Sequence, residues 1–204
     1  MFGITIIFKI FIYISSVHDK FHRTLILSGF CLLKIAKDKG LPVTCDVAMH
    51  QLHLTDQLID GFNSLAHVRP PLRAESDKEL LRQGVKSGVI DAICTHHEPL
   101  SSSAKLAPFA ETQPGITAFD TYVAFGVQLV REGLFSPLEW VEKVTIAPAT
   151  VANMLERWSA EAGWVLIDPE LDWIVNKDNI LSQGKNTPLI NQVVKGKVER
   201  IFII

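Results

Sequence analysis

Apolar runs that stop abruptly at polar residues recur along this chain and predict buried strands. One run covers Val43 to Ala48 and a second covers Val89 to Cys94. Helical patterns over Leu25 to Lys39 and over Ser76 to Lys86 precede them. Two successive helix–strand units favour a parallel sheet with right-handed crossovers, so the pattern predicts an α/β fold.

Capping signals support the same two helices. Gly40 and Gly88 follow the last helical residues, where glycine commonly ends a helix. Ser76 is followed three residues later by Glu79, which predicts a capping box at the start of the second helix.

The spacing of apolar residues changes in the second half of the chain. Three helical stretches are followed by alternating apolar residues, which predict a small sheet beside the parallel strands. The helices are expected over Phe119 to Arg131, from Ser136 to about Lys143 with Pro137 in the first turn, and in the Thr150 to Trp158 stretch. The strands are expected over Trp164 to Pro169, then Trp173 to Val175, and over Val193 to Ile204.

Titratable residues follow both predicted parallel strands. His50 lies just beyond the first strand, and the second runs into Thr95, His96, His97 and Glu98. Barrel enzymes present catalytic groups at the carboxyl ends of their strands. The strand ending at Cys94 is therefore the expected centre of a functional site.

Composition narrows the function classes. The chain has 204 residues with 48% hydrophobic residues, enough for one packed domain or a piece of a larger protein. The net charge of −2 and the lack of a basic stripe argue against nucleic-acid binding. Cys31, Cys45 and Cys94 form no CxxC pair and are expected to be buried, reduced thiols of a cytoplasmic protein.

The N-terminal segment is rich in Ile and Phe. The apolar stretch from Phe2 to Ile14 is shorter than the roughly 20 residues of a membrane span and contains Lys9. The expected explanation is either a β-strand or an artefact of how the gene start was assigned. A membrane-associated protein anchored by this stretch is kept as an alternative that the rest of the sequence does not support.

A set of short motifs carries a family resemblance. From about Lys34 to Val198 the chain resembles the C-terminal half of a dihydroorotase, in the amidohydrolase superfamily of metal-dependent TIM-barrel hydrolases. The matching runs are Val43–Val47, Pro70–Arg73, Ile90–Ile93, Thr95-x-His97-x-Pro99, Ala104–Lys105, Ala107–Phe109, Pro114–Ile116 and Gly184–Pro188.

The resemblance implies a partial TIM-type (β/α) barrel. About the last three βα units are recognisable, whereas a whole barrel needs about 200 to 250 residues. The expected organisation is an atypical apolar segment over residues 1–30, a partial barrel over 31–160 and a C-terminal β segment over 161–204. A truncated product or a fragment is therefore expected.

The resemblance also implies site residues. In the family, zinc activates a hydroxide and an aspartate after the last strand transfers the proton. His96 stands at that aspartate position and is the candidate catalytic residue, with His97, Arg69, Pro114 and Gly115 on the substrate side. His22 and His50 are weak metal-ligand candidates. The family pattern has histidines where Gln51 and Leu100 stand.

These departures indicate a catalytically impaired, non-enzymatic member that does not keep stoichiometric zinc. Non-catalytic homologues of this family serve as structural partners of aspartate transcarbamoylase in pyrimidine biosynthesis, and this partner is expected here. The alternative is an active zinc-dependent cyclic amidohydrolase that uses His50, His96 and His97 on dihydroorotate or carbamoyl aspartate. The sequence leaves both open, and it predicts neither a nucleic-acid nor a membrane partner.

Overall fold

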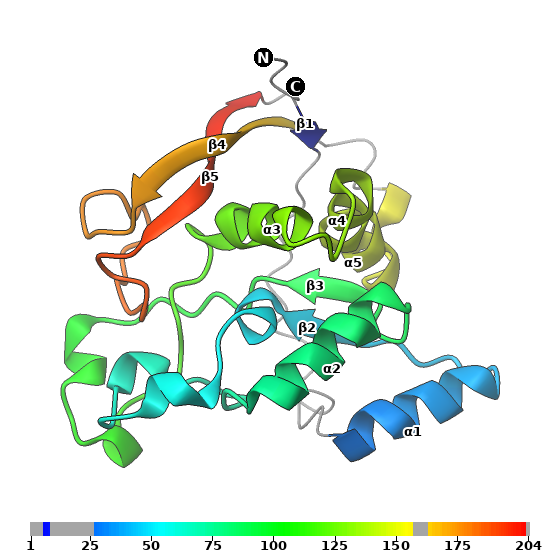
Figure 1. Cartoon of the computed structure of the whole chain (residues 1–204), viewed down its shortest axis with the longest axis horizontal. Coiled ribbons are helices and arrows are strands. Elements are labelled where there is room, and N and C mark those ends of the chain that lie inside the picture. Colours follow the sequence, from blue (N-terminus) through cyan, green and yellow to red (C-terminus); the bar gives the residue numbers. More distant parts are fainter. Residues whose placement is uncertain (1–5, 9–26, 157–162, 203–204) are drawn as a thin grey trace.

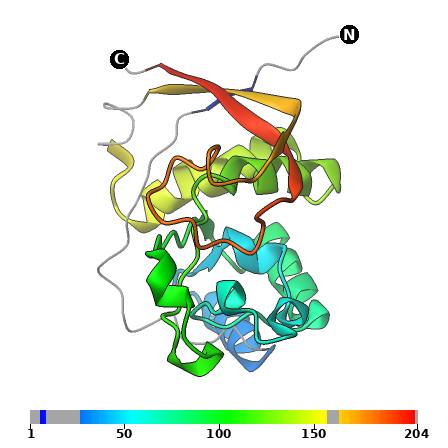
Figure 2. The same cartoon turned by 90° about the vertical axis from the view of Figure 1, so that its left-hand side faces the viewer.

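The computed structural model describes residues 6–8, 27–156 and 163–202 of the chain. Two sheets and a layer of helices make up these residues (Figure 1). The three-stranded sheet lies on one side, α3, α4 and α5 lie beneath it, and the two-stranded sheet with α2 and α1 lies beyond (Figures 1 and 2). The fold is mixed α/β, and the described strands form no closed barrel.

Two parallel strands form the barrel-like part. Strand β2 (Asp46–Ala48) pairs in parallel with β3 (Ala92–Cys94), with Ala48 opposite Cys94. The parallel pairing is confirmed, but both strands are shorter than predicted. Gly88 has a positive φ, and Ile90 donates its N–H back to Gly84, so the chain is still turning where a strand was expected. Asp91 contacts Cys45 through its backbone N–H and marks the start of pairing.

The helices before these strands are confirmed. Helix α1 (Leu27–Asp38) and helix α2 (Glu75–Lys86) match the predicted ranges within two residues. The capping box at Ser76 is wrong, because the N-cap is Ala74 and no side chain caps it. The first turn of α2 instead carries an ion pair between Lys78 and Glu75.

The middle helices place a buried layer under the larger sheet. They are α3 (Tyr122–Arg131), α4 (Pro137–Val144) and α5 (Ile146–Val151). Helix α4 has a capping box in which Ser136 and Glu139 exchange hydrogen bonds. Helix α3 starts three residues after the predicted Phe119, and α5 starts before the predicted Thr150. Trp158 lies outside the described residues.

The C-terminal sheet is confirmed. Strand β4 (Trp164–Ile174) pairs antiparallel with β5 (Val193–Phe202) and, on its other edge, with β1 (Ile6–Phe8). A strand was one of the two explanations expected for the N-terminal apolar stretch, and β1 confirms it for its three residues. Gly196 is required by close packing, since its φ is +96° and an added Cβ would lie 2.8 Å from Val127 of α3.

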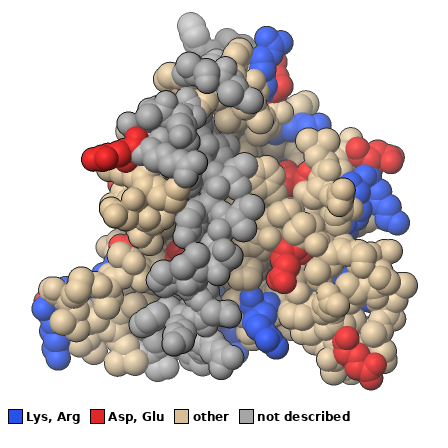
Figure 3. All heavy atoms as spheres, turned by 180° about the vertical axis from the view of Figure 1, so that it is seen from behind, with Lys and Arg blue, Asp and Glu red and all other residues tan. Residues whose placement is uncertain are grey.

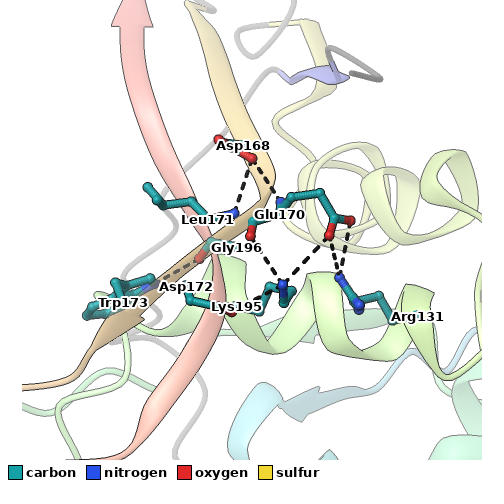
Figure 4. A network of polar contacts seen from close by, with 8 residues as sticks. All are labelled: Arg131, Asp168, Glu170, Leu171, Asp172, Trp173, Lys195 and Gly196. Carbon is teal, nitrogen blue, oxygen red and sulfur yellow. Dashed lines mark hydrogen bonds and ion pairs between the residues drawn. The ribbon is translucent and has the colours of Figure 1, made fainter. Parts of the chain in front are cut away.

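A network of hydrogen bonds and ion pairs on the surface connects β4 and β5 to α3 (Figure 4). The Asp168 carboxylate accepts the backbone N–H groups of Glu170 and Leu171, which shapes the irregular register after Asp168. The bulged residue Glu170 then pairs with Arg131 of α3 at 3.1 Å and with Lys195 of β5 at 3.7 Å.

Several surface features bear on the predictions. All three cysteines are free. Cys31 is exposed, which contradicts its predicted burial. It lies on α1, where the side chain of Leu32 is also 66% exposed. On the face in Figure 3, basic and acidic side chains of the described residues are interspersed among uncharged ones. Over the same described ranges, every helix is too short or too polar to cross a membrane.

Candidate functional site

The parallel register brings histidines from two strand ends together. The short 3₁₀ helix η1 (Met49–Leu52) follows β2 and carries His50, while His96 follows β3 after one intervening residue, Thr95. Their ring centroids lie 5.8 Å apart and the rings meet edge to face at 79°. The structure therefore brings these two candidates together at the strand tips.

His50 is fully enclosed. Its side chain is 1% exposed, and neither ring nitrogen has a hydrogen-bond partner in the part of the chain that the structure describes. Burial, with a smaller effect from nearby His96, lowers the pKa of His50 to about 3. The ring is neutral at pH 7 and offers one nitrogen lone pair and one N–H.

His96 sits at a sharp change of chain direction. Its φ is +46°, in the left-handed region that residues with a Cβ seldom occupy. Such strain is found where surrounding structure holds a residue in place, often at functional sites. The turn leaves the imidazole half-buried and directed at His50.

His97 has a defined tautomer. Its Nδ1 accepts hydrogen bonds from the backbone N–H groups of Ala118, at 3.2 Å, and Phe119, at 3.1 Å. Burial lowers the pKa of His97, opposed by the nearby charge of Asp120. Nδ1 therefore carries no proton, and Nε2 is left as an N–H donor. A donor of this kind suits an oxygen acceptor on a bound molecule.

The other substrate-side candidates lie on two separate loops. Gly115 is buried with φ +151°, and an added Cβ would lie 3.0 Å from Glu98 and from Leu100. Its N–H donates to the carbonyl of His67 at 2.9 Å. Pro114 precedes it and is half-buried, whereas Arg69 is exposed.

One organiser of the site was missed by sequence reasoning. Asn186 is 3% exposed, and its Oδ1 accepts from the Leu100 N–H at 2.7 Å and the Thr117 hydroxyl at 2.8 Å. Its Nδ2 donates to the carbonyl of Glu98 at 3.0 Å. Asn186 therefore fixes the loop that follows His96 and His97. The Gly184–Pro188 motif was the signal for it, but sequence spacing alone does not assign this contact.

Gln51 has a structural contact at a position where the resembling family has a histidine. Its side chain is 6% exposed, and Nε2 donates to the carbonyl of Pro70 at 2.9 Å. The side chain therefore holds the Arg69–Pro71 loop against η1.

The described residues do not assemble a metal centre. They contain no group of three or more His, Cys, Asp or Glu side chains placed to hold one ion. His50 is an orphaned nitrogen donor, but Cys94, next to Asp46, is kept as a thiol because burial and that carboxylate raise its pKa. His22 lies outside the described residues. These side chains alone do not fit the zinc site that the resemblance implies.

Comparisons with curated proteins give relatives over most of the chain. A dihydroorotase-like protein of Pseudomonas aeruginosa is 38% identical over 192 residues, covering 93% of this chain and 45% of the relative. A dihydroorotase of Syntrophus aciditrophicus is 35% identical over 170 residues, covering 82% of this chain and 40% of the relative. The chain is homologous to the dihydroorotases. This confirms the recognition made from the motifs, although the homologue spans less than half the length of these relatives. No family model matches it.

Solved structures agree on the fold of this dihydroorotase homologue. A dihydropyrimidinase from Brevibacillus agri superposes with a TM-score of 0.77 at 18% identity, covering 85% of this chain and 41% of the other. An inactive dihydroorotase-like domain of a Chaetomium thermophilum CAD-like multifunctional protein gives 0.59 at 20% identity, covering 86% and 46%. At these identities the likeness shows the fold, which is that of part of an amidohydrolase barrel.

Proposed function

We propose that this dihydroorotase homologue is a catalytically impaired, cytoplasmic protein of pyrimidine biosynthesis that acts as a structural partner of aspartate transcarbamoylase. The observation that carries the proposal is the imidazole of His96 at the strand tip, facing the neutral imidazole of buried His50. The resembling family has a carboxylate at this position.

The charge at the tip explains the expected loss of activity. A carboxylate both accepts a proton and supplies negative charge that balances a cationic centre, whereas a neutral imidazole supplies only a lone pair. A second imidazole at 5.8 Å adds no negative charge. Replacing a general base in this way is expected to lower the rate by orders of magnitude.

The contacts of neighbouring residues support a framework role. Gln51 holds the Pro70 carbonyl, and the Leu100 backbone is held by Asn186. Both positions carry histidines in the family pattern. Among the relatives, the Pseudomonas protein is called dihydroorotase-like, and the Chaetomium domain is described as inactive within a multifunctional CAD-like protein.

The test uses the full chain co-expressed with aspartate transcarbamoylase from the same source. Gel filtration is expected to show one complex, with zinc well below one equivalent by elemental analysis and no opening of dihydroorotate. Separate elution of the two proteins would refute the partner role. Stoichiometric zinc together with turnover would refute catalytic impairment.

An active zinc-dependent cyclic amidohydrolase is the second candidate. The buried, unpartnered nitrogens of His50 favour it, because such atoms usually have a partner in a complete site. It requires further metal ligands from outside the described residues. Zinc uptake that is lost in a His50→Leu variant of the full chain would favour it over the framework role.

A further inference from the structure

The loop between β4 and β5 extends from the C-terminal sheet to the strand-tip region, where it is drawn in orange (Figures 1 and 2). We call residues 180–186 of this loop the strap. Lys185 closes the strap on itself, because its Nζ donates to the carbonyls of Ile180, at 2.5 Å, and Ser182, at 2.6 Å. Ile180 is 2% exposed, so one end of the strap is anchored in the core. The strap is therefore a preformed unit.

The strap holds both ends of one short segment of chain. At one end, Thr117 donates its N–H to the carbonyl of Asn186 at 2.9 Å. At the other end, the Asp120 carboxylate accepts the N–H of Leu181 at 2.6 Å and the hydroxyl of Ser182. Only two residues lie between Thr117 and Asp120. The strap therefore restrains the peptide groups of these two residues from both sides.

These two peptide groups are the donors to His97. The N–H groups of Ala118 and Phe119 both donate to Nδ1 of the imidazole. Two successive N–H groups meet at one atom only while the backbone between them keeps one conformation. The Phe119 ring also meets the imidazole edge to face at 67°, with centroids 5.9 Å apart. The orientation of His97 therefore depends on the segment that the strap restrains.

The backbone that follows His97 is bound to the same strap. The Asn186 side chain accepts the N–H of Leu100 and donates to the carbonyl of Glu98. The strap thus holds His97 twice. Asn186 restrains its backbone, and Asp120 restrains the donors to its imidazole.

We propose that Asp120 is a positioning residue for His97. By joining residue 119 to the strap, it keeps Nδ1 as the acceptor of two backbone N–H groups and leaves Nε2 as an N–H donor at the strand tip. Asp120 acts through the backbone and through no reacting atom. Its role is the same in a framework protein and in an enzyme, because it concerns the protein without a ligand.

Nuclear magnetic resonance of the full chain labelled with ¹⁵N tests the role first in the wild type. At pH 7, Nδ1 of His97 is expected to have the chemical shift of an unprotonated nitrogen. It should also show a scalar coupling, across the hydrogen bond, to the amide nitrogen of Ala118 or Phe119. A protonated Nδ1, or coupling to neither amide, would overturn the proposal without any variant.

Asp120→Ala removes both acceptor atoms that bind the strap. The coupling to Nδ1 should be lost, and the amides of Ala118 and Phe119 should exchange with solvent about tenfold faster or more. The Val175 amide, which donates to the Gln192 carbonyl at the base of the same loop, should keep its rate within about twofold. This comparison separates a local effect at His97 from a general loss of stability.

Two further variants separate hydrogen bonding from charge and from position. Asp120→Asn keeps an oxygen that accepts the Leu181 N–H, so it should preserve the coupling to Nδ1. Asp178→Ala removes a carboxylate from an exposed position of the same loop and should change the two exchange rates by less than about twofold. The proposal is overturned if Asp120→Ala keeps the coupling, if Asp120→Asn loses it, or if Asp120→Ala and Asp178→Ala act alike.

Discussion

The strand-tip region and the C-terminal sheet are stabilised in different ways. Strands β4 and β5 pair from Trp164 opposite Phe202 to Ile174 opposite Val193, so backbone hydrogen bonds hold most of the sheet. Strands β2 and β3 pair over only three residues each. Beyond them, side-chain amides bond to backbone groups far away in sequence, as Asn186 does to Leu100 and Glu98. Single side chains therefore carry more of the stability at the tips than in the sheet.

The largest effect is expected from Asn186→Ala. The change removes the buried partner of the Leu100 N–H and the Glu98 carbonyl, and it should lower the free energy of unfolding by about 3 kcal/mol or more. Urea denaturation of the full chain measures this. Gln192→Ala removes an exposed amide from the same C-terminal part and should change stability by less than about 0.5 kcal/mol. Equal effects of the two variants would contradict the difference between the regions.

Low pH is expected to lower the stability of the protein where the strand-tip region meets helix α3. The pKa values of His50, at the tip, and His53, stacked on Phe125 of α3, are lowered to about 3, mainly by burial. An unfolded imidazole titrates near 6.5, so the unfolded state takes up protons first. The stability is fully present above pH 6.5 and falls as the pH drops towards 3.

Between pH 6.5 and 5.5, each buried histidine should lower the free energy of unfolding by about 1 kcal/mol. Denaturation at a series of pH values checks this in the wild type and in the His50→Leu and His53→Leu variants. Each variant should lose about half of the slope over this interval. An unchanged slope in both would show that other groups control the acid response.

A smaller effect is expected within the sheet. Trp173 Nε1 donates to the Gly196 carbonyl at 3.0 Å, a buried bond between β4 and β5. Trp173→Phe removes this donor and should lower the free energy of unfolding by about 1 to 2 kcal/mol. Trp164→Phe, at a side chain 44% exposed, is the matched control and should be nearly neutral. A larger loss for Trp164 in thermal or urea unfolding would contradict the assigned packing.

The smallest effect is expected from the surface ion pairs in Figure 4. Glu170→Gln removes the charge that pairs with Arg131 and Lys195 and should lower the free energy of unfolding by about 0.5 kcal/mol. The difference from wild type should shrink in 1 M salt, because exposed ion pairs are screened. A difference that grew with salt would show that Glu170 acts through packing instead.

The same contrast explains which features could be predicted from the sequence. The spacing of apolar residues and the residues that end helices and strands located α1, α2, β4 and β5. These signals are local in the sequence. Ser136 and Glu139 form a real capping box, whereas Ser76 and Glu79 do not, since α2 starts before Ser76. A two-residue motif does not set the position of the first helical turn.

The site was predicted only in part. His50 and His96 were placed together by the parallel register, which follows from the strand pattern. The roles of Asn186 and Gln51 depend on contacts between segments distant in sequence, so no local pattern reveals them. The roles of His97, Pro114 and Gly115 in binding substrate stay predictions.

The hydrogen bond from Gln51 to Pro70 has a consequence for engineering or evolving activity in this chain. An imidazole at position 51 keeps this contact only if one ring nitrogen donates its N–H to the Pro70 carbonyl, which leaves the lone pair of the other nitrogen for a metal. The position of the Pro70 carbonyl therefore selects which ring nitrogen is available. A return to a metal-binding tip would depend on the loop that is already in place, although that loop takes no part in the chemistry.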